Sequence, residues 1–292
     1  LVSLWLAQTA EIKELIEHGD LSLSIEVDFD LQREKANIKG FFYELETIQQ
    51  IQDLLYVLQK VHIFIAKNNE EYQQLSQLFA NVDIDFSLID AISRVLGPDG
   101  EIKPNASKAL QTIISDIRKA ERSIIKSSQS LFTSAKDKGL LGDTELGIKN
   151  GRVVLPVLSE HKRKINGVLI DQSGTGKISY IEPMELVSLN NELAELQIKK
   201  RQEIIAILKK LTQEIVVYID DLKKGQNKLG VFDFIRAKAR LASEWKCVLP
   251  TLGSSTEVEQ AAHPLLHERL KTEGQSIVPL SYQLHNDQRL II

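Results

Sequence analysis

Apolar residues recur every three or four positions along two long stretches of the chain, which predicts two long helices. The first stretch is 104–138, with Ala106, Leu110, Ile113, Ile117, Ala120, Ile124, Leu131 and Ala135 as its apolar positions. Only Ser127 and Ser128 interrupt this spacing. The second stretch is 183–224, with Leu189, Leu193, Leu196, Ile204, Leu208, Leu211, Ile215, Ile219 and Leu222. Such helices are longer than a small core needs, and antiparallel pairing is the simplest way to bury both apolar stripes.

Residues 139–182, between these stretches, have a different pattern. Glycines punctuate short apolar runs at 153–157, 167–170 and 178–181. Short apolar runs bounded by turn residues are typical of strands, so this segment predicts a small antiparallel β module. The two helices would then lead to the module and back from it.

The flanking segments predict smaller elements: a helical stripe over 41–65, a helix over 70–80, a tight turn over 96–102 and a third helix over 232–245. The predicted fold class is therefore mainly α with a small β module. The predicted domains are a helical core (1–103 and 225–250), an outgoing helix (104–138), a β module (139–182), a returning helix (183–224) and an incomplete strand-rich end (251–292). Because the chain lacks an initial Met and ends on the apolar residues 290–292, we expect a piece of a longer protein.

Composition narrows the class of protein. The 292 residues are 43% hydrophobic, enough for more than one domain, and the net charge of -4 indicates neither a nucleic acid nor a membrane as partner. No apolar run approaches the roughly 20 residues of a membrane span, and the first residues lack a signal-peptide pattern, so we expect a cytoplasmic protein without a membrane partner. The single cysteine, Cys247, rules out an internal disulfide, and we expect it to be buried.

One segment reverses the overall charge. Between residues 149 and 177, two carboxylates, Glu160 and Asp171, stand against the basic side chains of Lys149, Arg152, Lys162, Arg163, Lys164 and Lys177. These residues fall on glycine-rich turns, where backbone N–H groups can also approach a phosphate. The pattern favours a nucleic-acid phosphate site, without base stacking because no aromatic residue interleaves before Tyr180. The alternative is a solvated basic loop with no partner.

Two short motifs do not carry enzymatic chemistry. The run 173–177 resembles a phosphate-binding loop, but Asp171 stands where that loop needs glycine and Ile178 where it needs Ser or Thr. We interpret the run as a hairpin turn. His263 and His267 are four residues apart, but Pro264 lies between them and the metalloprotease glutamate is absent. The sequence thus predicts no catalytic residue and no metal ligand.

Several longer runs resemble the second, anti-recombination family of MutS proteins. The resemblance to that family's clamp rests on 150–157 (NGRVVLPV), 167–176 (GVLIDQSGTG), 180–183 (YIEP) and 189–193 (LNNEL). Residues 232–239 (FDFIRAKA) resemble the segment that returns to the family's core, and 262–266 (AHPLL) its entry to the ATPase domain.

The resemblance implies an elongated MutS-type helical core, with 104–138 and 183–224 as lever helices and 139–182 as a β-rich clamp at their tip. It implies that 251–292 is the truncated start of an ATPase domain, so that ATP, Mg and a C-terminal small MutS-related nuclease domain belong to the full-length protein. This chain itself would bind no cofactor and would not be an enzyme.

The resemblance further implies that the full-length protein is a homodimeric ATPase that acts on branched or duplex DNA to restrain recombination or in DNA repair. In some relatives the target is the stalled ribosome and hence ribosomal RNA. The alternative function is a coiled-coil scaffold whose β tip binds a protein partner.

Overall fold

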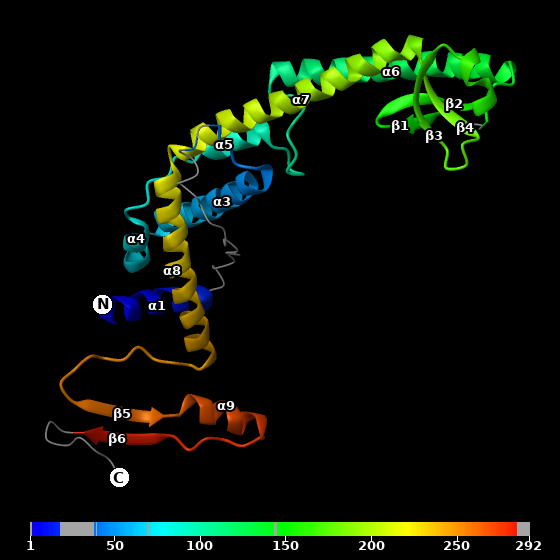
Figure 1. Cartoon of the computed structure of the whole chain (residues 1–292). Coiled ribbons are helices and arrows are strands. Elements are labelled where there is room, and N and C mark those ends of the chain that lie inside the picture. Colours follow the sequence, from blue (N-terminus) through cyan, green and yellow to red (C-terminus); the bar gives the residue numbers. More distant parts are fainter. Residues whose placement is uncertain (1, 18–37, 39, 69, 143–144, 285–292) are drawn as a thin grey trace. The chain divides into compact units, whose positions relative to one another are not determined.

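The computed structural model describes residues 2–17, 38, 40–68, 70–142 and 145–284 (Figure 1). The chain divides into two compact units, one built from 1–27, 57–84 and 221–292 and the other from 28–56 and 85–220. The helices are α1 (Val2–Glu17), α3 (Leu45–Asn68), α4 (Gln73–Phe79), α5 (Ser87–Val95), α6 (Lys108–Asp137), α7 (Met184–Val216), α8 (Ile219–Glu244) and α9 (Pro264–Thr272). The strands are β1 (Gly147–Lys149), β2 (Arg152–Leu158), β3 (Gly167–Gln172), β4 (Ile178–Pro183), β5 (Thr256–Ala261) and β6 (Leu280–Leu284), and η1 (Ser159–Lys164) is a 3₁₀ helix. The fold is mainly α with a small antiparallel sheet, as the sequence predicts.

The long helices α6 and α7 lie side by side and antiparallel in the second unit (Figure 1). Ser107 caps α6, because its hydroxyl accepts from the N–H of Leu110 (2.9 Å) and donates to the carboxylate of Glu203 on α7 (2.7 Å). Ser128, which interrupts the apolar spacing, is buried, and its hydroxyl donates to the carbonyl of Ile125 in the same helix. This bond satisfies the hydroxyl without a partner from another element.

The stretch 183–224, which we expected to form one helix, forms two. Helix α7 ends at Val216 and α8 begins at Ile219, and the amide of Tyr218 donates to the carbonyl of Ile215. The hydroxyl of Tyr218 also pairs with a carboxylate oxygen of Asp85 (3.2 Å). Helix α8 then continues through the predicted third helix.

Strands β1 to β4 form one antiparallel sheet in the order β1-β2-β4-β3. The buried side chains of Leu155, Val157 and Ile181 on the sheet pack with Ala135 near the end of α6. The sheet therefore lies against the last turns of α6. Gly167 permits close pairing of β3 with β4, since a Cβ atom there would lie 2.3 Å from the carbonyl oxygen of Glu182.

The first unit has a separate core around Phe232 of α8. It is built from Ile12, Leu15, Tyr72, Leu75, Leu78, Ile235 and Ala239. Glu11 of α1 fixes the start of α4, because its two carboxylate oxygens accept from the N–H groups of Gln74 and Leu75, each at 2.9 Å. This pairing satisfies two amides that the first turn of a helix leaves free.

The first unit also contains β5, α9 and β6. Strands β5 and β6 pair antiparallel, which agrees with the strand-rich pattern expected for 251–292.

Cys247 is exposed, so our expectation of a buried thiol is wrong. Its backbone carbonyl, just beyond the end of α8, accepts a hydrogen bond from Nζ of Lys13 (3.0 Å). The apolar residues 290–292 lie outside the described residues. No described helix is both long enough and apolar enough to cross a membrane.

Candidate nucleic-acid interface

The β1–β2 hairpin places two of the candidate cations opposite each other. Its two-residue turn is Asn150 and Gly151, with φ of 50° and 73°, the left-handed values that a tight hairpin requires. The strand register pairs Lys149 with Arg152. Like charges directly opposite on a sheet are unfavourable, and each of these two side chains has its own carboxylate partner.

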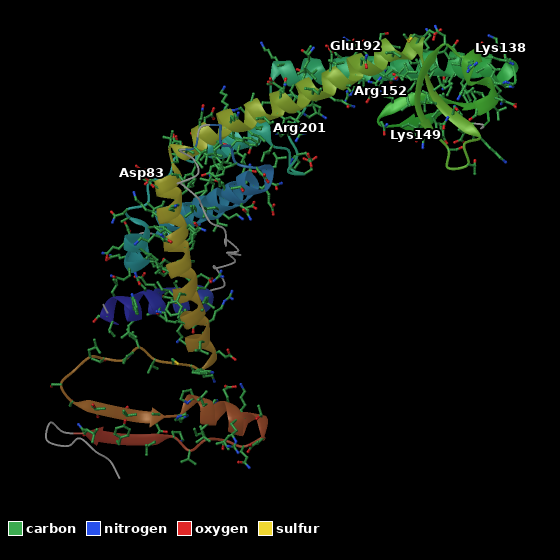
Figure 2. All side chains as sticks on the ribbon, viewed as in Figure 1. Asp83, Lys138, Lys149, Arg152, Glu192 and Arg201 are labelled. Atoms are coloured by element: carbon green, nitrogen blue, oxygen red, sulfur yellow. The ribbon has the colours of Figure 1, made fainter. Side chains whose placement is uncertain are left out.

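Lys149 reaches across the sheet from β1 toward β3. Its Nζ lies 3.3 Å from a carboxylate oxygen of Asp171 and 4.4 Å from the ring centroid of Tyr180. The amide of Gln172 donates to Asp171 (2.8 Å), and this bond, with the bond from Lys149, holds the pKa of Asp171 below its usual value. Lys149, which Figure 2 labels on the β module, is thus engaged by Asp171 and Tyr180.

Arg152 has a more enclosed environment. Its Nη1 donates to both carboxylate oxygens of Glu182, at 2.8 and 2.9 Å, and its Nη2 donates to Oδ1 of Asn191 (2.8 Å). Glu182 is 1% exposed and also accepts from Nδ2 of Asn190 (2.9 Å). The guanidinium therefore joins β2 to β4 and to the first turns of α7.

The other four candidate cations lie on two segments that Ser159 joins. Its amide donates to the carbonyl of Lys177 (2.9 Å) and its hydroxyl to the carbonyl of Gly176 (2.6 Å). The hydroxyl also lies 3.0 Å from that of the buried Ser179. Helix η1 is thereby held against the turn between β3 and β4.

We call the exposed side chains on these two segments the basic tip: Lys162, Arg163, Lys164 and Lys177. Within the described part of the chain, none of the four has a carboxylate partner at ion-pair distance. Glu160, the acid of η1, lies instead 3.6 Å from Nε2 of His161. The basic tip therefore presents charges that remain available to an anion, whereas Lys149 and Arg152 each have a carboxylate partner within the module.

The turn at the basic tip has the geometry we predicted for it. Gly176 has φ of 71°, and its amide donates to the carbonyl of Ser173 (2.8 Å). Ser173 in turn exchanges bonds with Ile178, where β4 begins. Residues 173–177 thus connect two antiparallel strands, whereas a nucleotide-binding loop of this type joins a strand to a helix.

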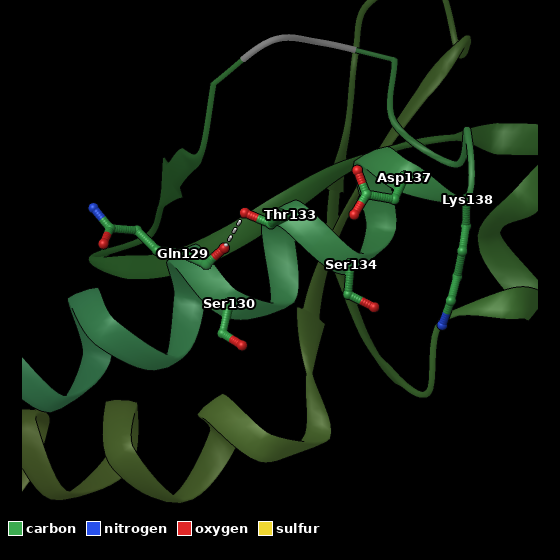
Figure 3. A pocket seen from close by; sticks show the side chains of 6 residues that line it. All are labelled: Gln129, Ser130, Thr133, Ser134, Asp137 and Lys138. Carbon is green, nitrogen blue, oxygen red and sulfur yellow. Dashed lines mark hydrogen bonds between the residues drawn. The ribbon is translucent and has the colours of Figure 1, made fainter.

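The described structure also contains a hollow on helix α6 and two histidines near α9. A hollow of about 620 Å³ on α6 is lined by Gln129, Ser130, Thr133, Ser134, Asp137 and Lys138 (Figure 3). All these residues belong to α6 or its C-cap, so no second element encloses a ligand. Among the described residues, no group of His, Cys, Asp and Glu is arranged to hold a metal. His263 has a structural contact, because its Nδ1 accepts from the amide of Leu266 at the start of α9 (3.4 Å).

Sequence reasoning missed four residues that organise this region: Ser159, Glu182, Asn190 and Asn191. Three of these residues belong to runs on which the family resemblance rests: Glu182 lies in the YIEP run, and Asn190 and Asn191 lie in the LNNEL run. The structure shows that these separated runs meet around one guanidinium.

The chain is similar to known proteins over most of its length. No family model matches the chain. The Endonuclease MutS2 of Agathobacter rectalis is 33% identical over 262 residues, covering 88% of this chain and 32% of the relative. That of Enterococcus faecalis is 32% identical over 221 residues, covering 75% of this chain and 28% of the relative. That of Bacillus cytotoxicus is 29% identical over 290 residues, covering 98% of this chain and 36% of the relative.

The chain spans about a third of the length of these curated relatives. The matches run through the helices and the β module alike, because they cover most of the chain. At about 30% identity over this extent, the similarities support a MutS2-like family for this protein.

Proposed function

We propose that this chain is the core, lever and clamp region of a MutS2-like protein, and that its β module grips nucleic acid by the phosphate backbone. The observation that carries the proposal is the junction at Ser159, which joins η1 to the β3–β4 turn and so gathers the basic tip from two segments. Pairing of Leu158 with Ile178 brings the two segments together, and the bonds of Ser159 then fix η1 against the turn that carries Lys177.

Phosphate contacts suit the chemistry of the basic tip. Lys162, Arg163, Lys164 and Lys177 are exposed and can neutralise phosphates, which releases condensed counterions from the polymer. Tyr180, the nearest aromatic residue in the sequence, has its ring covered by Lys149 rather than free to stack on a base. The module would therefore bind with little dependence on base sequence.

For the full-length protein we propose a homodimeric ATPase with a C-terminal endonuclease domain, in which ATP and Mg bind outside this chain. It would act on branched or duplex DNA in recombination or repair, or on ribosomal RNA of stalled ribosomes. This chain alone would be neither an ATPase nor a nuclease and would dimerise weakly. The name Endonuclease MutS2 of the relatives supports the assignment of a nuclease to the whole protein.

The second candidate function is a scaffold whose β module binds another protein. The observation that favours it is apolar exposure on the sheet, where Ile148 is 74%, Leu169 49% and Val168 45% exposed. Apolar contacts weaken little with salt, whereas phosphate contacts weaken steeply, so the two functions differ in a measurable way.

The test is a set of anisotropy titrations of the chain with labelled duplex DNA, branched DNA and duplex RNA at several salt concentrations. Four phosphate contacts predict a slope of log affinity against log salt of about -3.6 on B-form DNA, at about -0.9 for each contact. Absence of binding at low salt, or affinity that does not change with salt, would contradict the proposal and favour the scaffold.

A further inference from the structure

The most enclosed charge cluster in the β module involves Arg152, one of the cations predicted to contact phosphate. The cluster contains Arg152 of β2, Glu182 of β4, and Asn190 and Asn191 of α7, and we call it the Arg152 network. The carboxylate of Glu182 is 1% exposed and accepts three hydrogen bonds, two from Arg152 and one from Asn190. The guanidinium donates to the buried Glu182 and to the exposed Asn191, and its own side chain is 33% exposed.

We infer that the Arg152 network is an orientation lock that fixes the β module on the first turns of α7. Arg152 is then a positioning residue and does not contact phosphate. The inference concerns how the module is held and does not depend on which polymer or protein the module binds.

The geometry of arginine suits such a lock. The guanidinium is rigid and planar, and its Nη1 donates to both carboxylate oxygens of Glu182, which limits where the carboxylate can lie relative to Arg152. A second nitrogen, Nη2, donates to Asn191, which lies on a different element from Glu182. One side chain thus sets the relative orientation of β2, β4 and α7.

The backbone connection alone does not fix this orientation so firmly. Strand β4 passes directly into α7 at Pro183 and Met184, and the amide of Met184 donates to the carbonyl of Asn166 before β3 (3.0 Å). The Arg152 network adds a contact from β2, which is the inner neighbour of β4 in the sheet.

The energetics of buried ion pairs also indicate that the Arg152 network fixes an orientation more than it stabilises the fold. Removing a carboxylate from water is costly, and an apolar cluster of similar volume is often as stable as a buried ion pair. Such a pair does, however, tolerate only arrangements in which every donor meets its acceptor. A structure that places a carboxylate in the interior and surrounds it with donors from β2 and α7 thereby gains a defined geometry.

The chain offers a matched control for this inference. Lys149 is the cross-strand neighbour of Arg152 and, like it, is paired with a carboxylate inside the module. Its partners, Asp171 and Tyr180, both lie on the sheet and not on α7. Lys149→Gln therefore removes the same charge from the same hairpin without touching the junction.

The test measures the distance between the module and α7 by pulsed electron paramagnetic resonance. Spin labels are placed at the exposed positions Thr175 and Gln197, in a Cys247→Ser background that removes the single native cysteine. The parent and Lys149→Gln are expected to give one narrow distance distribution. Arg152→Gln and Glu182→Gln are each expected to give a distribution roughly twice as wide or wider, and the double variant one no wider than either, because both changes break the same network.

Narrow distributions in both Arg152→Gln and Glu182→Gln would overturn the inference. If either variant fails to fold, Asn191→Ala is used instead, because it removes an exposed partner of the guanidinium and is expected to broaden the distribution as well. The salt slope of DNA binding separates this inference from the proposed function. A positioning Arg152 leaves that slope unchanged on substitution by Gln, whereas a phosphate contact would reduce it by about 0.9.

Discussion

The hydroxyl of Ser159 donates to the carbonyl oxygen of Gly176 across 2.6 Å, and this bond joins the basic 3₁₀ helix to the turn that carries Lys177. The bond connects residues far apart in the sequence, so neither segment predicts it alone. The arrangement of the basic tip depends on it together with the backbone bond between the same two segments.

Ser159→Ala is expected to weaken DNA binding severalfold, because it removes the side-chain bond that fixes η1 on the turn carrying Lys177 and leaves only the backbone bond from the Ser159 amide to Lys177. Losing one hydrogen bond costs about 1 kcal/mol, which corresponds to roughly fivefold in affinity if the whole effect appears in binding. Anisotropy titrations at constant salt measure it. Ser130→Ala, on the exposed face of α6, is the control and should bind like the parent. Equal affinities for the parent and the Ser159 variant would contradict the role of the junction.

Gly167→Ala is expected to destabilise the β module by about 2 kcal/mol or more, as overpacking against backbone does. The new Cβ atom would lie 2.3 Å from the carbonyl oxygen of Glu182, and a strand cannot yield there without losing its pairing with β4. Gly174→Ala is the matched control, because no atom lies within 4 Å of the position that its Cβ atom would take. Urea unfolding followed by circular dichroism, with amide exchange of β3, distinguishes them; equal stability of both variants would refute this packing argument.

Tyr43→Phe is expected to leave the fold intact and to raise the free energy of unfolding by about 1 kcal/mol. The side chain is 4% exposed and its hydroxyl has no hydrogen-bond partner in the described structure. Burial also raises the pKa of Tyr43, which reflects the same loss of water. Tyr218→Phe is the comparison, since it removes a hydroxyl that pairs with Asp85 and should bring no gain. A clear loss of stability in Tyr43→Phe would indicate a partner for that hydroxyl.

Asp171 is expected to titrate below the usual aspartate pKa of about 3.9. The amide of Gln172 lowers its pKa most, followed by the hydrogen bond from Lys149. A depressed folded-state pKa contributes stability above the unfolded value, and this contribution is lost as the pH falls through the folded value. Carbon NMR of the carboxylate measures the midpoint, and Lys149→Gln should move it only part of the way back. A midpoint at or above the usual value in the parent would contradict the assignment.

The long-period patterns in the sequence predicted most of the second unit. Repeated apolar spacing is sufficient to predict α6 and the start of α7. These helices have 30 and 33 residues, so the apolar spacing repeats over many helical turns. The break after Val216 had no such signal, since neither Gly nor Pro stands at 217–218 and the apolar spacing continues through it. Helices α1 and α5 were not predicted, the latter being only nine residues long.

The candidate site was only partly predictable for a physical reason. Counting charges along 149–177 finds the cations but not their partners, and the partner of Arg152 lies 30 residues away on β4. The same limit applies to Cys247, whose exposure depends on how the chain leaves α8. Local sequence therefore indicated the basic region, while contacts between separate strands and helix α7 decide that Lys149 and Arg152 have carboxylate partners.

The most direct test of phosphate binding at the basic tip compares two triple alanine variants that remove the same charge. One replaces Lys162, Arg163 and Lys164 on η1, and the other replaces the exposed residues Lys199, Lys200 and Arg201 on α7. The slope of log affinity for duplex DNA against log salt is measured for each. We predict that it falls from about -3.6 in the parent to about -0.9 in the η1 variant, where Lys177 alone remains, and stays near about -3.6 in the α7 variant. An unchanged slope in a folded η1 variant, or an equal reduction in both variants, would contradict the account.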